Sequence, residues 1–218
     1  MACSDRVAAV ALNLPMFIQD RLPLLPVPGI PEIVLHKAVP TSGLARLAAA
    51  DADFGTPFWA YYWLGGLGLA RFVLDRPEWV QGRRVLDLGC GSGLVGIAAA
   101  RAGAASVIAA DIDRYALAAL GLNAIANGVA IETVPGDLLG GETPDVELVL
   151  AGDLFYEAGL AERALGFLAR CRAAGIDVLV GDPWRAPLPQ ERLRMLAEYR
   201  FAETDSPVTR PTGVFALD

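Results

Sequence analysis

The sequence contains few of the residues from which metal sites and disulfide frameworks are built. Its 218 residues include one histidine, His36, and three cysteines, Cys3, Cys90 and Cys171. The cysteines are odd in number and widely spaced, which indicates neither a disulfide framework nor a zinc site. A single histidine argues against a histidine-based metal centre. We therefore expect no metal, and we expect His36 to be an ordinary surface or loop residue.

Charge and long apolar runs are also scarce. Only 20% of the residues are charged, the net charge is −7, and no block of Lys or Arg is present. Because nucleic-acid-binding proteins usually show a basic stripe, we expect no nucleic-acid substrate. No apolar run is long enough to cross a bilayer. The apolar patch at residues 7–14 lacks the basic lead and cleavage site of a signal peptide. We expect a cytoplasmic protein without a membrane partner.

A glycine-rich stretch, VLDLGCGSG at residues 85–93, organises the rest of the chain. Its apolar start predicts a buried parallel strand, and the apolar run of residues 94–102 predicts a helix that ends at Gly103. The three alternate glycines (89, 91 and 93) predict a sharp turn between these two elements. Dinucleotide sites have GxGxxG spacing instead. Asp87 would repel a pyrophosphate but would accept hydrogen bonds from an ammonium group. A glycine-rich turn in some other α/β protein is the alternative.

Acidic residues also follow the next predicted strands. The second strand ends at Asp111, the third (residues 130–134) leads into Asp137, and the fourth (residues 147–153) ends at Asp153. The carboxyl ends of parallel strands meet at one edge of a sheet, where ligands bind. Asp111 is placed to bind ribose hydroxyls. Asp137 is placed to reach an adenine amino group, unless it is a plain turn aspartate.

The region after residue 82 alternates between strands and helices. Helices are predicted at residues 114–127, with Asp113 as N-cap, at residues 158–172 and at residues 191–199. A fifth strand is predicted at residues 177–182, and residues 201–204 and 213–217 predict an antiparallel hairpin. This pattern predicts an α/β fold with a mostly parallel sheet, helices on both faces and an antiparallel edge.

Residues 1–56 are predicted to form an N-terminal arm, and residues 57–218 the main domain. Residues 4–22 predict a helix with Ser4 as N-cap and a break or kink at Pro15. Residues 23–32 contain too many prolines for a regular element and predict an extended segment. A short strand is predicted at residues 32–39 and a helical turn or two at residues 42–51.

An aromatic stretch, PFWAYYWLGG at residues 57–66, precedes a helix predicted at residues 65–74. We interpret Phe58 and Tyr61 as a hydrophobic plug between the arm and the core. Trp63 stands just before two glycines, which allow a close approach of the backbone. Its indole ring is therefore a candidate wall of a ligand site.

Several segments together resemble the class I (seven-β-strand) S-adenosylmethionine (SAM)-dependent methyltransferases. The DxGxGxG motif alone indicates only this class. The segments PFWAYYWLGG, ADID, LNAIANG, GDLFY and GDPWR more specifically resemble the electron-transfer flavoprotein β-subunit lysine methyltransferase family. The resemblance covers residues 31–218. It implies a Rossmann-like, seven-stranded sheet, with SAM as cofactor and S-adenosylhomocysteine as product.

The resemblance also implies roles for single residues. The methionine end of the cofactor would contact Asp87 and the loop residues Gly89, Cys90, Gly91 and Gly93. The ribose and adenine would contact Asp111, Ile112, Asp137 and Leu138, and Trp63 would line the pocket. Asp153 and Tyr156 would be catalytic, and the acceptor would contact Trp59, Phe155, Trp184 and Arg185. Trp184 departs from the family pattern, which has a small residue there.

A lysine acceptor must lose a proton before it attacks a methyl group. Only about one free lysine in 2500 is neutral at pH 7. A neighbouring carboxylate raises the lysine pKa and burial lowers it. We therefore expect Asp153 to orient the amine rather than act as a strong base. Tyr156, Phe155 and Trp59 would form an apolar wall that tolerates a methylated ammonium. Core packing is the alternative for Phe155.

Three classes of function follow from these patterns. The first is methylation of a protein lysine, with an electron-transfer flavoprotein β-subunit as a candidate acceptor; methylation of a ribosomal protein is an alternative to it. The second is methylation of a small amine or a heteroaromatic nitrogen, such as that of nicotinamide. The third is a catalytically silent SAM-binding module, against which the intact DxGxGxG and DLFY segments argue.

Overall fold

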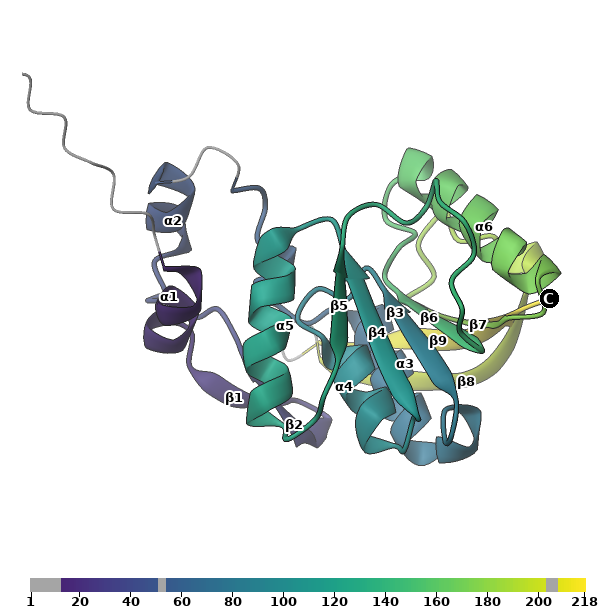
Figure 1. Ribbon diagram of the computed structural model, residues 1–218, viewed down its shortest axis with the longest axis horizontal. Coiled ribbons are helices and arrows are strands. Elements are labelled where there is room, and N and C mark those ends of the chain that lie inside the picture. The colour runs from purple at the N-terminus through teal and green to yellow at the C-terminus, as the bar shows by residue number, and fades with distance from the viewer. Residues whose placement is uncertain (1–12, 51–53, 203–207) are drawn as a thin grey trace, which may run out of the picture.

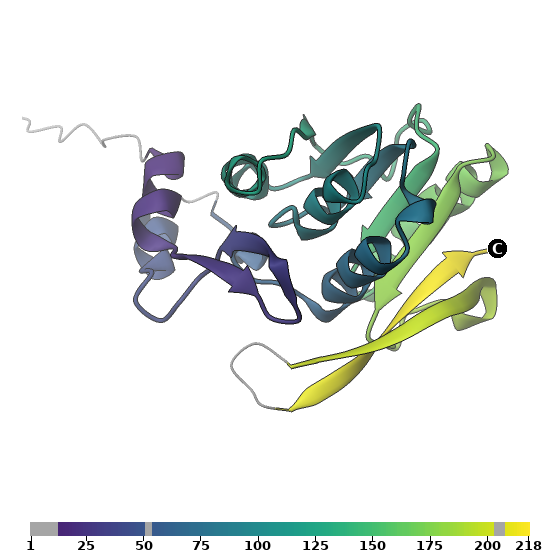
Figure 2. The same ribbon diagram turned by 90° about the horizontal axis from the view of Figure 1, so that it is seen from below.

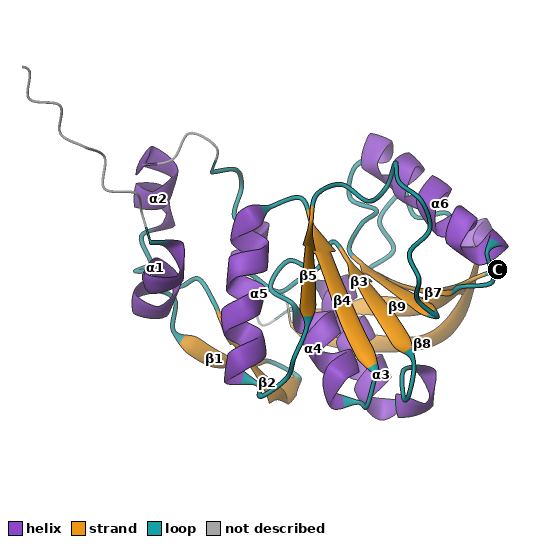
Figure 3. Cartoon of the chain, viewed as in Figure 1, coloured by secondary structure: helices purple, strands orange, loops and turns teal. Residues whose placement is uncertain are grey.

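The computed structural model describes residues 13–50, 54–202 and 208–218. In these residues a seven-stranded sheet has the order β5-β4-β3-β6-β7-β9-β8, and β1 and β2 form a separate hairpin (Figures 1 and 3). The predicted fold class is confirmed. The parallel strands are β3 (Arg84–Leu88), β4 (Ser106–Asp111), β5 (Glu132–Pro135), β6 (Leu148–Gly152) and β7 (Asp177–Asp182), and the antiparallel strands are β8 (Leu193–Ala202) and β9 (Thr209–Leu217).

Both faces of the sheet are covered because successive side chains of a strand point to opposite sides. In β6, Leu148 and Leu150 pack into one buried cluster, and Val149 and Ala151 pack into another. Helices α3 (Leu64–Asp75) and α4 (Leu94–Arg101) cover the first face, and α6 (Ala158–Ala173) covers the second (Figure 2). Helix α5 (Arg114–Ala126) begins at the predicted N-cap Asp113, whose side chain accepts a hydrogen bond from the Tyr115 N–H.

The N-terminal region differs from the predicted arm. Helix α1 (Leu14–Arg21) carries its proline in the first turn, where no hydrogen bond is lost, so the expected kink is absent from the described residues. The predicted cap Ser4 lies outside them. The proline-rich segment was expected to be irregular, which is wrong: it forms the hairpin of β1 (Leu24–Val27) and β2 (Ile30–His36). Each strand of a hairpin leaves alternate N–H groups unpaired, and prolines are tolerated at such positions.

Three other expectations concern the N-terminal region: the position of His36, the helix after it and the domain boundary. His36 lies at the end of β2, half-buried, with Nδ1 2.7 Å from the Leu22 carbonyl oxygen, so the expectation of a surface or loop histidine is wrong. Helix α2 (Leu44–Ala50) matches the turn or two expected there. The division of the chain at residue 56 stays a prediction.

The predicted helix at residues 191–199 is also wrong, because this segment belongs to β8. Its local sequence favours a helix, but it pairs along β9 from Leu193 opposite Leu217 to Ala202 opposite Thr209. This ladder joins β8 to a strand that is buried over most of its length, and such tertiary pairing overrides local propensity.

The strand order places the ligand-binding edge of the sheet. From β3 the chain builds outward through β4 to β5, and it then returns to place β6 on the other side of β3. Crevices form outside the carboxyl ends of the strands at such a reversal.

Candidate active site

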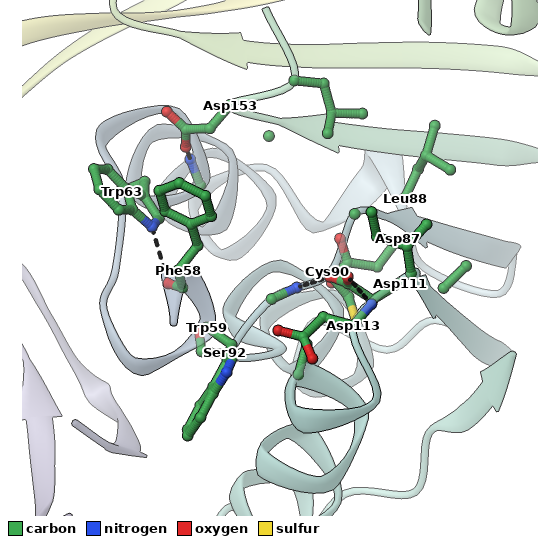
Figure 4. Close-up of a pocket in the computed structure, with 18 of the residues that line it drawn as sticks. Phe58, Trp59, Trp63, Asp87, Leu88, Cys90, Ser92, Asp111, Asp113 and Asp153 are labelled. Atoms are coloured by element: carbon green, nitrogen blue, oxygen red, sulfur yellow. Dashed lines mark hydrogen bonds between the residues drawn. The ribbon is translucent and has the colours of Figure 1, made fainter. Parts of the chain in front are cut away.

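A cavity of about 840 Å³ lies at this edge (Figure 4). Its volume is that of a site for a cofactor-sized ligand. Most residues predicted from the sequence to belong to the site line the cavity: Trp59, Trp63, Asp87, Gly89, Cys90, Gly91, Asp111, Ile112, Asp137, Leu138, Asp153, Tyr156 and Arg185.

The glycine loop forms the floor of the cavity between β3 and α4. Gly89, Gly91 and Gly93 all have positive φ angles, which favour glycine. A β-carbon on Gly91 would meet only the Cα of Trp59, at 3.9 Å, so this backbone is open to a ligand. Gly93 instead packs against Leu120 and does not line the cavity, so its predicted contact with the cofactor is not supported.

Asp87 is a buried acid that has one hydrogen-bond partner, the Gly96 N–H, among the residues that the structure describes. It is 2% exposed, and its Oδ2 accepts a hydrogen bond from the Gly96 N–H at 2.8 Å. Burial raises the pKa of Asp87 to about 7, with a smaller contribution from the charge of Asp111; the Gly96 hydrogen bond opposes the shift. A cationic group in the cavity would compensate this carboxylate.

Asp111 ends β4 and connects the two sides of the cavity floor. Its Oδ2 accepts from the Gly91 N–H at 2.9 Å, and its Oδ1 accepts from the Asp113 N–H at 2.9 Å. A carboxylate has about four acceptor positions, so Asp111 retains capacity for ligand hydroxyls. Ile112 follows it and is exposed beside the cavity. These features fit an adenosine ribose.

Asp137 is already paired within the protein. Its carboxylate accepts from the Leu139 N–H at 3.0 Å and forms an ion pair with Arg163, which holds the pKa of Asp137 below its ordinary value. Both partners are largely exposed, so the pair adds little stability. Asp137 and Leu138 line the cavity, and their contact with an adenine base stays a prediction.

Asp153 connects three elements at the opposite side of the cavity. Its two oxygens accept from the Gly65 and Gly66 N–H groups at 3.0 and 2.6 Å, at the start of α3. Arg185 Nη1 lies 2.8 Å from Asp153 and 2.9 Å from Asp182. Burial raises the pKa of Asp153, against the opposing effects of Arg185 and the two amides. Three hydrogen bonds occupy most of the acceptor positions of this carboxylate.

Three partly exposed aromatic rings stand at the mouth of the cavity. Phe58 is 50% exposed, Trp63 43% and Tyr156 55%. The Phe58 ring lies 5.7 Å from that of Trp63 and 6.0 Å from that of Tyr156, and the Trp63 Nε1–H donates to the Phe58 carbonyl at 3.0 Å. Figure 4 shows Phe58 and Trp63 on the side of Asp153, away from the floor acids. The interpretation of Phe58 as a hydrophobic plug is therefore wrong.

Two residues that were predicted to contact the methyl acceptor lie outside the cavity. Phe155 is fully buried in the cluster beneath α6, because the turn after β6 points its ring into the core, and Leu154 lines the cavity instead. Trp184 packs edge-on against Phe215 at a ring distance of 5.6 Å. The prediction that these two side chains contact the acceptor is corrected. Trp59 lines the cavity at its floor, buried and stacked on Tyr115, rather than at the mouth.

Sequence reasoning missed some residues of the site. Asp182 is fully buried and binds the Arg185 backbone N–H at 2.7 Å as well as its guanidinium group. Its position at the end of β7, like that of the other acids at strand ends, was a signal that could have identified it. Nothing in the sequence distinguished the exposed Phe58 from its buried neighbour Trp59.

Known methyltransferases are similar to this chain. The family model of ribosomal protein L11 methyltransferase (PrmA) matches residues 72–152. Electron transfer flavoprotein beta subunit lysine methyltransferases are similar over most of the chain. That of Xenopus laevis is 40% identical over 183 residues, 81% of this chain and 74% of the relative. The human protein is 38% identical over 180 residues, 80% and 69% of the two chains.

Among solved structures, the ribosomal protein L11 methylase of Lactobacillus delbrueckii subsp. bulgaricus is similar with a TM-score of 0.52. It is 26% identical, and the match covers 68% of this chain and 75% of that chain. The fold and the cavity thus define a SAM-dependent methyltransferase. The lysine methyltransferases match about four fifths of this chain, which identifies a narrower family within that class. The chain belongs to the family of the electron transfer flavoprotein beta subunit lysine methyltransferases.

Two findings concern only the part of the chain that the structure describes. It contains no helix both long and apolar enough to cross a membrane. It also contains no cluster of three or more His, Cys, Asp or Glu side chains suited to hold a metal ion.

Proposed function

We propose that this protein methylates the amino group of a lysine in an acceptor protein, and that the β-subunit of an electron transfer flavoprotein is the acceptor. The homologous methyltransferases named for this subunit support the acceptor. The single observation in the structure that carries the proposal is the exposed aromatic mouth, described above, beside a cavity with a buried acid. A lysine on a protein surface can reach this mouth without complete enclosure.

The cavity floor would hold the cofactor. The buried Asp87 carboxylate would bind the ammonium group of the methionine end, and Asp111 would bind the ribose hydroxyls. The indole Nε1 of Trp59 is buried without a partner among the described residues, so it is a candidate donor to the carboxylate of the same end. When bound, SAM supplies an electrophilic methyl group on its sulfonium sulfur.

The opposite side of the cavity would hold the acceptor. We assign Phe58, Trp63 and Tyr156 to a wall that removes water from the lysine amine and so lowers its pKa. The same rings would accept a methylated ammonium through cation–π contact. Asp153 and Arg185 would fix the position of α3 and of the mouth. Because the Asp153 oxygens are largely occupied, it would orient the amine at most, and it would not remove its proton.

The test is incubation with radiolabelled SAM and either the purified human electron transfer flavoprotein or a small-molecule filtrate of a cell lysate. Label in the β-subunit band is the expected result. Label only in the filtrate would replace the proposal with small-amine methylation. Tyr156→Ala should reduce turnover at least a hundredfold. Tyr199→Phe is the matched control, because this tyrosine bonds Asp75 at 3.2 Å outside the cavity and should leave turnover unchanged.

A further inference from the structure

One asparagine connects the N-terminal hairpin with the glycine loop. Asn123 lies in α5 and is fully buried. Its Oδ1 accepts a hydrogen bond from the His36 N–H at the end of β2, at 2.8 Å. Its Nδ2 donates to the carbonyl of Ser92, within the glycine loop, also at 2.8 Å. The main-chain donor and acceptor together fix the orientation of the amide group.

The position needs a side chain that accepts from the His36 N–H and also donates to the Ser92 carbonyl. A carboxylate or a hydroxyl side chain does this less well than an amide. An aspartate has no donor for the Ser92 carbonyl when ionised, and a serine is too short to reach two backbones on opposite sides. LNAIANG is a segment that the cofactor contacts do not explain. Its first asparagine has this bridging position, and no other described residue is shown to bond both the loop and the hairpin.

The second asparagine of the same segment provides a natural comparison. Asn127 accepts from the Val34 N–H at 3.0 Å and donates to the Val34 carbonyl at 2.7 Å. It therefore binds the same strand of the hairpin, one helical turn away. Among the described residues its side chain bonds only Val34 and the Asn123 carbonyl, at 2.7 Å, and not the glycine loop. Strand β2 lies along α5 through these two amides (Figure 1).

The loop end of this bridge lies in the cofactor cavity, and the hairpin end is connected to the cavity wall. Ser92 lines the cavity between two glycines with positive φ angles. Just after β2, the Ala38 N–H donates to the Ala60 carbonyl at 2.9 Å, and Ala60 is the neighbour of Trp59. A change in the loop conformation would therefore alter the geometry of the Asn123 amide and, through it, the hairpin.

We propose that Asn123 is a positioning residue that couples the N-terminal hairpin to the glycine loop. It holds the Ser92 carbonyl away from the ligand, in the conformation that binds the cofactor. Coupling between two sites is reciprocal, so cofactor binding also strengthens the attachment of the hairpin. This proposal requires cofactor binding only, and it stands or fails independently of the acceptor.

The first test needs no variant. In the full chain, hydrogen exchange of the His36 amide should slow at least fivefold when S-adenosylhomocysteine is added. Ligand binding at the loop strengthens the hydrogen bond from this amide to Asn123, and opening of that bond becomes rarer. Exchange that is the same with and without this ligand would overturn the coupling.

The second test compares Asn123→Asp with the control Asn127→Ala. Asn123→Asp keeps an acceptor for His36 but loses the donor to Ser92. The dissociation constant for S-adenosylhomocysteine, by calorimetry, should rise about tenfold, which corresponds to ~1.4 kcal/mol. In this variant, S-adenosylhomocysteine should no longer slow the hydrogen exchange of the His36 amide. Asn127→Ala should speed exchange of the Val34 amide but leave the dissociation constant within about twofold and the His36 protection intact.

Two results of this comparison would overturn the proposal. One is unchanged ligand affinity in Asn123→Asp. The other is an equal loss of affinity in both variants, which would mean that the two asparagines contribute only general packing. If Asn123→Asp does not fold, as judged by its thermal transition, the exchange experiment on the unaltered chain decides alone.

Discussion

The buried Asp87 carboxylate should make cofactor binding depend on pH near neutrality. Its pKa in the free protein is about 7, because burial disfavours its charge. An ammonium group binds the ionised form, so the proton must leave before or during binding. If only the ionised form binds, the dissociation constant varies as 1 + 10^(pKa − pH). It should then rise about 25-fold from pH 7.5 to pH 5.5.

Calorimetry with S-adenosylhomocysteine checks this magnitude in two ways. The dissociation constant is measured across this range. Titrations at pH 6.5 in buffers of different ionisation enthalpy count the protons released, about 0.8 per ligand. Asp87→Asn should bind much more weakly, with a flat profile over the same range. A flat profile in the unaltered protein would refute the assignment of Asp87 to the ammonium group.

The same residue should destabilise the free protein above neutral pH. The folded pKa of about 7 exceeds the ordinary value of 3.8, so the folded state holds the proton more tightly. The contribution of this group to the free energy of unfolding therefore rises as the pH falls below 7, and it is absent at higher pH. At pH 8, Asp87→Asn should stabilise the free protein by at most about 4 kcal/mol, since each pKa unit is worth 1.36 kcal/mol. Thermal unfolding at pH 8 and pH 5 measures this difference, which should shrink at the lower pH.

Other substitutions test the mouth and its support. Phe58→Ala should raise the KM for the acceptor protein about tenfold. The affinity for S-adenosylhomocysteine should stay the same, and a parallel loss of that affinity would argue against an acceptor role. Gly65→Ala should prevent folding or cost several kcal/mol of unfolding free energy, because its β-carbon would clash with the Gly181 carbonyl oxygen. Gly121→Ala has open space and should be neutral or stabilising in the same denaturant titration. Asp153→Asn should lower that free energy by about 2–3 kcal/mol through broken charged hydrogen bonds. An unchanged transition would mean that its contacts contribute nothing.

Much of the cavity floor could be predicted from local sequence. A buried strand, three alternate glycines and an apolar helix are neighbours in the chain, so their arrangement depends on short-range geometry. The same holds for Asp111 at a strand end and for the helix cap Asp113, which bonds its own helix. Acids at strand ends converge because parallel strands share one edge.

Other features depend on pairing between distant segments. The helix predicted at residues 191–199 became strand β8 because β9 offers it a ladder, and local propensity contains no information about that partner. The proline-rich segment became a hairpin for the same reason. Sequence spacing also gave no sign that Arg185 pairs with Asp153, since this contact requires β6 and β7 to lie side by side; the contact of Arg185 with Asp182, three residues earlier, is local.

The sequence by itself determined the class of fold and the glycines and acids of the cavity floor, because both are encoded in contiguous motifs whose backbone geometry is local. Only the tertiary structure decided which aromatic rings face the solvent. Phe58 and Trp59 are neighbours of the same chemical kind, yet one is 50% exposed and the other 1%. Trp59 is buried because α5 places Tyr115 against it, and Phe58 stays exposed at the mouth beside Tyr156. That difference arises from packing between elements far apart in the chain.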